Sequence, residues 1–446
     1  MKRDISIELL KWKESDRRKP LILRGARQVG KTWSLQSFGV EHYQNTAYLN
    51  FEEMPLASKL FKNDLNPHRI ILEIGLMLDI DILPNDTLII FDEIQACPEA
   101  LNSLKYFHEN ANDYHLVSAG SLLGIKLNKL NSFPVGKVNF LDLFPMSFCE
   151  FLDAIGKHKL RHYIDNVNFE VENLAIIPEP IHQQLVDLLK NYTFIGGMPE
   201  VVKHFCSSKN LRSVRAIQKE ILDAYLLDFS KHVVAHEVMK ITTIWNQIHS
   251  QLAKENKKFI FSAIKKSARG REYESAIMWL EDAGLVYKST NVTTAKIPID
   301  AYSHANVFKV FLLDVGLLGA MSNLPVGILV EDKRLFTEFK GAFIENLIAT
   351  FLAPMNNKKL FYWTSKNQAE VDFIIPYELD IYPLEVKAGI SKKKKSLLVY
   401  DDKFNPPLLA RTTLRNLRKD GNIVNIPLYL MHRFYDIVDN RPLQNS

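Results

Sequence analysis

The chain has 446 residues, which is too long for a single hydrophobic core, so we expect two to four domains. Hydrophobic residues make up 47% of the chain and charged residues 24%, which is ordinary for a soluble globular protein. The net charge of +5 permits a nucleic-acid partner but is too small to indicate one.

The N-terminus and the cysteines favour the cytoplasm. Residues 5–10 are helix-like and lack the apolar core of a secretory signal. No stretch approaches eighteen uncharged apolar residues, so we expect no membrane-spanning helix. Cys97, Cys149 and Cys206 are scattered without metal-ligand spacing, which favours buried thiols in a reducing compartment.

A phosphate-binding motif follows the first predicted strand, residues 21–23. It reads Gly25-x-x-x-x-Gly30-Lys31-Thr32, the loop of nucleoside triphosphatases, and the residues after it can continue as a helix whose N-terminus faces the anion. The glycines let backbone N–H groups approach phosphate oxygens. Lys31 places a cation near the β- and γ-phosphates, and Thr32 offers a hydroxyl to Mg²⁺. We expect the nucleotide to contact Gly25, Ala26, Arg27, Gln28, Val29, Gly30, Lys31, Thr32 and Trp33.

A second strand is predicted at residues 47–51, with a helical region after it to about residue 78. The strand pattern 87–91, apolar from residue 88 onwards, then ends in Asp92 and Glu93. Parallel sheets bury their strands on both faces and bind ligands at the carboxyl ends of those strands. We therefore expect Asp92 to hold Mg²⁺, directly or through water, and Glu93 to polarise the attacking water.

Residues 115–121 predict the next strand, which ends in a polar residue. Ser121 is the candidate contact for the γ-phosphate or the water, with Ser118 behind it, although a serine after a glycine is more often part of a turn. A strand at 138–143 and a helix beginning at 145–152 continue the alternation. This alternation predicts an α/β fold with a mostly parallel sheet, the P-loop ATPase domain, over residues 1–150.

Helical patterns dominate residues 151–240, which we interpret as a helical lid and connector. Residues 241–325 show three short helical patterns and then a strand at 284–288, the order of a winged helix-turn-helix module. Basic residues lie where a recognition helix would begin: Lys265, Lys266, Arg269 and Arg271. They are candidate DNA contacts, although such modules often serve only protein packing.

A second group of chemically active residues lies in residues 330–446. Glu345 sits in an apolar helical pattern, and two strand patterns carry Asp372 and Glu385-Val386-Lys387. Strand alternation places Glu385 and Lys387 on one face. The three carboxylates could bind Mg²⁺, and Lys387 could activate a water or stabilise phosphorane charge.

This D…E-x-K arrangement is typical of restriction-endonuclease-like nucleases, with Asp372, Glu385 and Lys387 as catalytic residues. It predicts an α/β restriction-endonuclease-like domain. The alternative is a degenerate nuclease fold kept for binding or scaffolding, because fold does not imply function. Residues 392–395 are four lysines, which could follow a phosphate backbone or could form a solvated helix start.

The whole sequence resembles a group of prokaryotic AAA-type ATPases that carry a C-terminal domain of uncharacterised function. The segments that carry the resemblance are 24–32, 91–95, 120–123, 144–148, 196–200, 314–317, 345–346, 370–373 and 385–389. The resemblance implies ATP binding and a homo-oligomer in which a neighbour often supplies a catalytic cation.

The sequence departs from this group at two places. The group usually has a glycine-arginine pair after the strand at 115–121, and here the pair is Gly136-Lys137. Lysine lacks the planar fork of arginine, so a role for Lys137 towards a neighbouring subunit is in doubt. The usual arginine near the turn at 363–365 is also absent, which weakens the basic complement of the nuclease-like site.

Together these patterns predict a cytoplasmic, Mg²⁺-dependent ATPase. ATP hydrolysis would drive or gate the DNA-associated, nuclease-like C-terminal domain. The alternative is a nucleotide-dependent switch or scaffold that has a catalytically dead nuclease fold and acts through protein partners.

Overall fold

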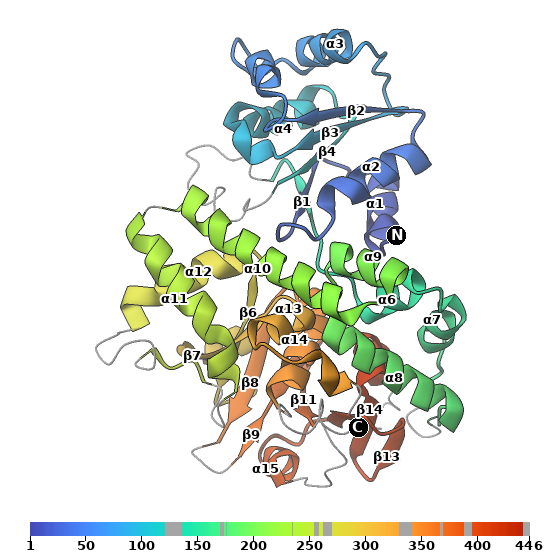
Figure 1. Cartoon of the computed structure of the whole chain (residues 1–446), viewed down its shortest axis with the longest axis vertical. Coiled ribbons are helices and arrows are strands. Elements are labelled where there is room, and N and C mark those ends of the chain that lie inside the picture. Colours follow the sequence, from blue (N-terminus) through green and yellow to red (C-terminus); the bar gives the residue numbers. More distant parts are fainter. Residues whose placement is uncertain are drawn as a thin grey trace. The chain divides into compact units, whose positions relative to one another are not determined.

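The chain folds into two compact units, shown in the computed structural model of Figure 1. The first comprises Met1–Phe144 with Asp282–Leu285, and the second Pro145–Glu281 with Val286–Ser446. The structure describes residues 1–120, 136–169, 174, 176–233, 235–253, 258–261, 270–329, 341–365, 369–387 and 395–439. Over these ranges, no helix is both long and apolar enough to cross a membrane.

The first unit is built on a five-stranded sheet in which all neighbouring strands run parallel. The order is β2-β3-β4-β1-β5, so β1, which leads into the phosphate-binding motif, lies between β4 and β5. The strands are β1 Leu21–Arg24, β2 Asn45–Asn50, β3 Thr87–Asp92, β4 His115–Ala119 and β5 Asn139–Asp142. The helical segments are α1 Ile5–Glu14, α2 Lys31–His42, η1 Pro55–Phe61, α3 Pro67–Leu78, η2 Ile94–Ala96 and α4 Pro98–Asn110. The predicted parallel α/β architecture is confirmed.

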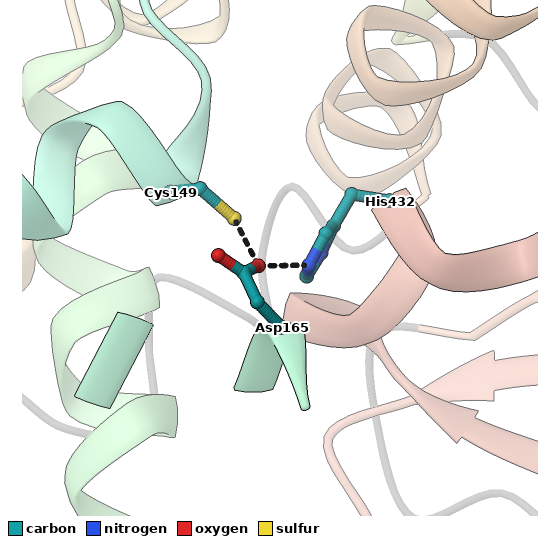
Figure 2. Close-up of side chains that lie close together, drawn as sticks. All are labelled: Cys149, Asp165 and His432. Carbon is teal, nitrogen blue, oxygen red and sulfur yellow. Dashed lines mark hydrogen bonds and ion pairs between the residues drawn. The ribbon is translucent and has the colours of Figure 1, made fainter. Parts of the chain in front are cut away.

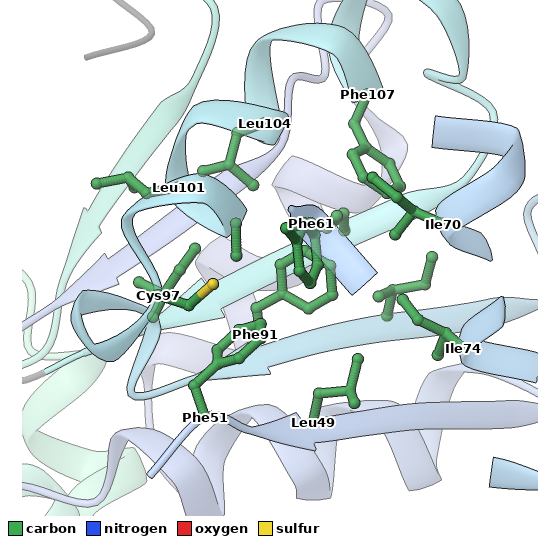
Figure 3. Packing of buried hydrophobic residues seen from close by; sticks show 14 of the residues in the cluster. Leu49, Phe51, Phe61, Ile70, Ile74, Phe91, Cys97, Leu101, Leu104 and Phe107 are labelled. Atoms are coloured by element: carbon green, nitrogen blue, oxygen red, sulfur yellow. The ribbon is translucent and has the colours of Figure 1, made fainter. Parts of the chain in front are cut away.

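Aromatic packing fixes the carboxyl end of β3 (Figure 3). Phe91 makes edge-on contacts with Phe51 and Phe61, at centroid distances of 5.6 and 5.5 Å, and with Phe107 of α4 at 6.1 Å. All four rings are buried. Because close-packed interiors resist displacement, this cluster holds the backbone of the next residue, Asp92, in a defined position.

The second unit begins with helices. They are α6 Phe148–Ala154, α7 His158–Asp165, α8 Glu179–Ile195, α9 Pro199–Ser208, α10 Leu211–His232, α11 Ala235–Leu252 and α12 Gly270–Asp282, whose last residue belongs to the first unit. The helix predicted from residue 145 begins at Phe148, because Ser147 caps it: its hydroxyl accepts from the Glu150 N–H while the Glu150 carboxylate accepts from the Ser147 N–H.

Two sheets complete the second unit. One has the order β7-β6-β8-β9, and the other has the order β10-β11-β12-β14-β13. The strands are β6 Val286–Val292, β7 Ser303–Leu312, β8 Leu360–Thr364, β9 Glu370–Val371, β10 Phe373–Tyr377, β11 Asp380–Val386, β12 Leu409–Thr413, β13 Arg418–Asp420 and β14 Ile423–Pro427. The remaining helical segments are η4 Ile299–Tyr302, α13 Val315–Met321, η5 Val326–Leu329, α14 Ala342–Met355, α15 Lys395–Phe404, η6 Leu428–Arg433 and α16 Phe434–Asp439.

Two strands differ from the sequence expectations. The strand expected from residue 284 begins at Val286, since Gly284 has a φ of +71°, which a strand does not accommodate. The strand pattern that carries Asp372 is divided at that residue: β9 pairs with β8 and β10 pairs with β11. The Asp372 carboxylate accepts the Val386 N–H at 2.8 Å, so the residue at the division contacts the end of β11.

Three of the segments that carry the family resemblance pack against one another: 144–148, 196–200 and 314–317. The Asp314 carboxylate accepts the N–H groups of Gly197 (2.6 Å) and Leu317 (2.8 Å). Met146 N–H donates to the Gly197 carbonyl at 2.6 Å, and a Cβ on Gly197 would lie 2.1 Å from the Met146 carbonyl oxygen. Glycine is therefore required here by close backbone approach.

Candidate functional site

The phosphate-binding motif forms a tight loop between β1 and α2. Gly30 has a φ of +94° and Gln28 one of +64°, so the chain turns through left-handed conformations just before the helix. A Cβ on Gly25 would lie 2.3 Å from the carbonyl oxygen of Leu143. The first glycine is therefore fixed by close packing and the second by backbone conformation, and the loop leads directly into the N-terminus of α2.

Lys31 is buried within this loop, only 7% exposed. Its Nζ donates to the carbonyl oxygens of Gly25 (3.0 Å) and Ala26 (2.7 Å). Burial lowers the pKa of Lys31 to about 8, with the carboxylates of Glu93 and Asp92 acting in the opposite direction. The ammonium group therefore donates to neutral carbonyl oxygens in this structure. A bound phosphate would give it a negatively charged acceptor instead.

Thr32 and Asp92, the two predicted Mg²⁺ ligands from separate motifs, are in direct contact. The Thr32 hydroxyl donates to Asp92 Oδ2 at 2.7 Å, and Asp92 is only 2% exposed. The Tyr48 hydroxyl donates to the same oxygen at 2.9 Å, and the Glu93 N–H donates to Asp92 Oδ1 at 3.0 Å. This hydroxyl and carboxylate pair is a hard oxygen donor set that fits Mg²⁺.

Tyr48 is a member of this site that the sequence analysis missed. It lies on β2, in register with Ile90 of β3, and so reaches the Asp92 carboxylate from the neighbouring strand. Burial, followed by the adjacent Asp92 carboxylate, raises the pKa of Tyr48, which therefore remains a hydrogen-bond donor at physiological pH. A tyrosine in a half-buried strand is ordinary, so no sequence signal distinguished it.

Glu93, the predicted water-polarising residue, leaves the sheet at the end of β3 in a left-handed conformation with φ of +47°. Its carboxylate accepts a short hydrogen bond from the Gln95 side-chain amide. Non-glycine residues in this conformation are uncommon and concentrate at functional sites. Gln95 therefore orients the carboxylate expected to act on the water.

The predicted C-terminal residues also lie together. Lys387 Nζ is 2.9 Å from Glu385 Oε1, and Glu385 is 4% exposed, while Asp372 contacts the strand end between them through the Val386 N–H. Burial acts to lower the pKa of Lys387, but the carboxylates of Asp372, Glu385 and Glu345 outweigh it and the pKa is raised. These residues therefore form one electrostatic cluster.

Lys309 on β7 is a further member of this cluster that the sequence analysis did not assign to it. It is fully buried and its Nζ lies 2.6 Å from Glu370 Oε1 and 3.5 Å from Glu345 Oε2. Burial acts to lower the pKa of Lys309, but the carboxylates of Glu345, Glu370 and Asp372 outweigh it, so the pKa is raised. The only hint in the sequence was one lysine within an apolar strand pattern, which indicates a buried charge that needs partners.

The acidic residues of this cluster are held by lysines and by backbone. When all six groups are ionised, the carboxylates of Glu345, Glu370, Asp372 and Glu385 outnumber the ammonium groups of Lys309 and Lys387 by two. Their ligand atoms do not form a set of three within 4.8 Å of one another; over the described ranges that condition is met elsewhere, at Cys149, Asp165 and His432. Metal binding at the acidic cluster would therefore require side-chain movement.

One family model matches the part of the chain that contains the first site. Residues 17–152 match a family model described as an AAA domain. The first unit therefore contains an AAA domain. Residues 186–326 and 340–431 match two further models, each described as a domain of unknown function. No curated protein matches the chain.

Several solved structures are similar. A Walker-type ATPase of Pyrococcus abyssi is 14% identical, with a TM-score of 0.46, and the match covers 72% of this chain and 95% of that chain. The Aeropyrum pernix ORC1 protein in complex with DNA is 14% identical, with a TM-score of 0.28 and coverage of 72% and 91%. AMPPCP-bound DnaA from Aquifex aeolicus is 13% identical, with a TM-score of 0.28 and coverage of 62% and 85%.

The remaining candidates in the AAA domain have other partners or are not described. The Ser118 hydroxyl is buried and donates to the Leu21 carbonyl oxygen at 3.0 Å, so it joins β4 to β1. Ser121 lies outside the described residues. Lys137, at the position where the resembling group has arginine, pairs with Glu109 of its own domain at 3.0 Å.

The candidate nucleic-acid contacts fall mostly outside the described residues. This holds for Lys265, Lys266 and Arg269 and for residues 392–394. Arg271 lies in the first turn of α12, but its side chain is not described. The winged-helix arrangement therefore rests on α11, α12 and the β6–β7 hairpin, and stays a prediction.

Proposed function

We propose that this protein is a Mg²⁺-dependent ATPase whose nucleotide state drives or gates a DNA-associated, nuclease-like C-terminal domain. The observation that carries the ATPase proposal is the contact of Thr32 with Asp92 beside the buried Lys31. These three groups come from two motifs sixty residues apart. Their convergence at the carboxyl end of a parallel sheet is the arrangement that phosphoryl transfer requires.

Each residue has a defined task in this proposal. Lys31 exchanges the carbonyls of Gly25 and Ala26 for phosphate oxygens, while Thr32 and Asp92 hold the metal. Mg²⁺, when bound, neutralises charge on the β- and γ-phosphate oxygens. Glu93 accepts a proton from, or orients, the attacking water, and is itself oriented by Gln95.

Two variants test these roles. Lys31→Ala should lose ATP binding, because it removes the cation nearest the phosphates. Glu93→Gln should bind ATP but hydrolyse it poorly, because an amide does not take a proton. Equilibrium binding and phosphate release measure the two steps separately, and turnover retained in Glu93→Gln would refute the assignment of Glu93.

For the C-terminal domain we propose a restriction-endonuclease-like arrangement of α14, the β10–β11 hairpin, α15 and β12. Its support is the helix that carries Glu345 and the hairpin that brings Asp372 beside Glu385 and Lys387. In this role, Glu345, Asp372 and Glu385 would ligate a divalent cation. Lys387 would activate a water or stabilise charge on the phosphorane.

The rival proposal, a scaffold with a dead nuclease fold, is favoured by Lys309. Lys309 forms ion pairs with Glu345 and Glu370. Its ammonium group therefore lies beside the carboxylates where a nuclease would bind metal. A buried ion pair of this kind is difficult to open, because removing one partner leaves an uncompensated charge. Under this proposal the ATPase acts as a switch for protein partners.

One experiment separates the two proposals. Plasmid and single-stranded DNA are incubated with the protein and Mg²⁺ or Mn²⁺, with and without ATP, and Asp372→Ala serves as the contamination control. Cleavage that disappears in the variant supports the nuclease and shows whether ATP gates it. If the DNA stays intact under every condition while ATP turnover is unchanged, the result supports the scaffold proposal for this domain.

Further assignments accompany this proposal. Residues 151–240 would be a helical lid and connector, residues 241–325 a winged-helix-like module, and residues 330–446 the nuclease-like domain. The protein would act in the cytoplasm, and as a homo-oligomer. DNA binding would make log K fall linearly with log salt concentration, and no binding at low salt would contradict it.

A further inference from the structure

Three side chains that bind metals well, none of them part of the acidic cluster, converge in the second unit (Figure 2). Cys149 lies in the first turn of α6, Asp165 is the last residue of α7, and His432 belongs to η6. Cys149 Sγ is 3.9 Å from Asp165 Oδ1, and His432 Nε2 is 3.2 Å from the same oxygen. One ligand atom from each residue lies within 4.8 Å of the others.

We propose that Cys149, Asp165 and His432 bind a divalent transition-metal ion, Zn²⁺ in the first place. A thiolate, an imidazole and a carboxylate together select Zn²⁺ over Mg²⁺ or Ca²⁺, which prefer oxygen ligands alone. Such a site has three protein ligands, and its fourth position is open to water.

The spacing of the donors fits this ion. With Zn–S of about 2.3 Å, Zn–N and Zn–O of about 2.1 Å and tetrahedral angles, sulfur and oxygen lie about 3.6 Å apart and nitrogen and oxygen about 3.4 Å apart. The observed separations are 3.9 Å and 3.2 Å. These two separations lie within a few tenths of an ångström of the tetrahedral values, and the third, between sulfur and nitrogen, is within 4.8 Å.

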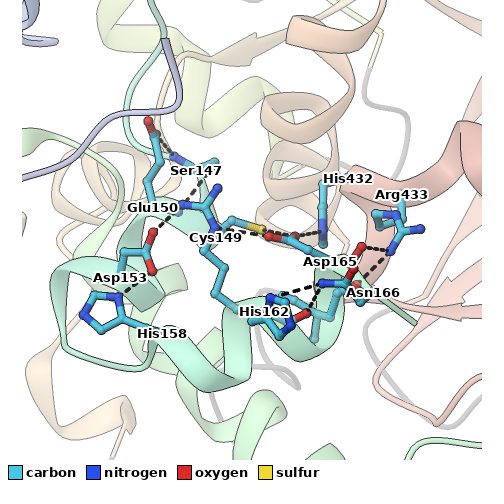
Figure 4. Close-up of polar contacts among 12 residues, drawn as sticks. Ser147, Cys149, Glu150, Asp153, His158, His162, Asp165, Asn166, His432 and Arg433 are labelled. Atoms are coloured by element: carbon cyan, nitrogen blue, oxygen red, sulfur yellow. Dashed lines mark hydrogen bonds and ion pairs between the residues drawn. The ribbon is translucent and has the colours of Figure 1, made fainter. Parts of the chain in front are cut away.

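The surroundings hold Asp165 in place (Figure 4). Arg161 Nε donates to Asp165 Oδ2 at 3.2 Å, which leaves Oδ1 towards Cys149 and His432. Arg161 is itself paired with Asp153, so its charge is partly balanced. Hydrogen bonds to the outer oxygen of a ligating carboxylate are the usual support of a metal site.

The backbone on either side of the site is also fixed. Arg433, the neighbour of His432, donates to the carbonyl oxygens of Ile164 (3.1 Å) and Asp165 (2.6 Å). These contacts join the end of α7 to η6 independently of any ion. The donor atoms are therefore pre-positioned, which lowers the free-energy cost of assembling the site.

Metal binding at this site exchanges a proton for the ion. The Cys149 thiol, which now donates to Asp165, loses its proton to solvent and its sulfur binds the metal as thiolate. His432 binds through Nε2, the nitrogen that now faces Asp165, and the proton of that hydrogen bond leaves to solvent or moves to Nδ1 as the tautomer changes. The ion would link Asp165 to a histidine 267 residues later in the chain. It would stabilise the folded state by a free energy that grows with the logarithm of its free concentration above Kd.

The test is Co²⁺ binding to the full-length protein after treatment with a chelator. A cobalt–thiolate bond gives a charge-transfer absorption band, which the oxygen ligands at Thr32 and Asp92 do not give. We expect this band to saturate at one Co²⁺ per chain and to disappear when Zn²⁺ is added. Absence of the band in the wild-type protein overturns the proposal.

Variants identify the ligands. Cys149→Ser should abolish the band, whereas Cys206→Ser should leave it unchanged, because the Cys206 thiol contacts the Ala154 carbonyl instead. His432→Ala should keep the thiolate but weaken Co²⁺ binding more than tenfold, which provides a test even if Cys149→Ser fails to fold. A band that persists in Cys149→Ser, or unchanged affinity in His432→Ala, refutes the site.

Discussion

The pH dependence of ATP affinity tests whether Lys31 is the buried cation described above. Burial lowers the pKa of its ammonium group to about 8 in the protein without nucleotide. Phosphate oxygens favour the charged form, so the pKa of Lys31 is higher in the complex. Above pH 8, ATP binding must therefore be accompanied by proton uptake at Lys31, and the affinity must fall as the pH rises.

The size of this effect follows from the pKa. The factor by which Kd increases is one plus ten raised to the difference between the pH and the pKa of about 8. Between pH 7 and pH 9 this amounts to about a tenfold weaker affinity, or about 1.4 kcal/mol. Calorimetry in buffers of different ionisation enthalpy measures the affinity and the proton uptake together.

The control is Lys31→Arg. A guanidinium group stays protonated throughout this range, so the affinity of the variant, although weaker, should not change between pH 7 and pH 9. A wild-type Kd that is constant between these pH values would show that Lys31 is charged throughout. The pKa argument from burial would then be wrong.

Three further predictions concern residues beside the motifs. Tyr48→Phe should lower ATPase activity at limiting Mg²⁺ about tenfold, because it removes a hydrogen bond of about 1.5 kcal/mol to the Asp92 carboxylate. Measuring ATPase activity against Mg²⁺ concentration tests this, and identical curves for the variant and the wild type would contradict it. Gly197→Ala should destabilise the fold by about 3 kcal/mol or more, because the new Cβ would meet the Met146 carbonyl, whereas Gly327→Ala, where a Cβ meets open space, should change the unfolding midpoint little. Burial raises the pKa of Asp314 from 3.8 to about 6. Between these pH values the folded state binds more protons than the unfolded state, so the free energy of unfolding falls as the pH rises, by about 3 kcal/mol in total. Urea unfolding of the wild type and of Asp314→Asn from pH 4 to pH 7 should show this fall in the wild type only.

The sequence predicted that Thr32 and Asp92 come together, because these residues lie in two short, contiguous motifs. The loop from Gly25 to Thr32 specifies its own backbone conformation, and the apolar strand before Asp92 specifies a buried parallel sheet. Tyr48 was missed because its contact depends on the register of β2 against β3, which periodicity does not determine.

The acidic cluster was predicted in part for the same reason. Asp372, Glu385 and Lys387 are close in sequence, and one hairpin brings them together. Lys309 comes from a strand 36 residues before Glu345 and reaches the cluster through sheet pairing. The residues Cys149, Asp165 and His432 are separated by 16 and 267 positions, so no ligand spacing exists for a sequence pattern to match.

The parallel pairing of β6 with β8 has a practical consequence for dissecting the protein. A fragment that begins at residue 330 would keep the predicted nuclease-like segment but would lose both β6 and β7. It would leave β8 with an unpaired apolar edge, the kind of edge through which proteins aggregate. It would also remove Lys309 and leave the buried Glu345 without that cation. A soluble C-terminal fragment must therefore begin before β6, upstream of Val286.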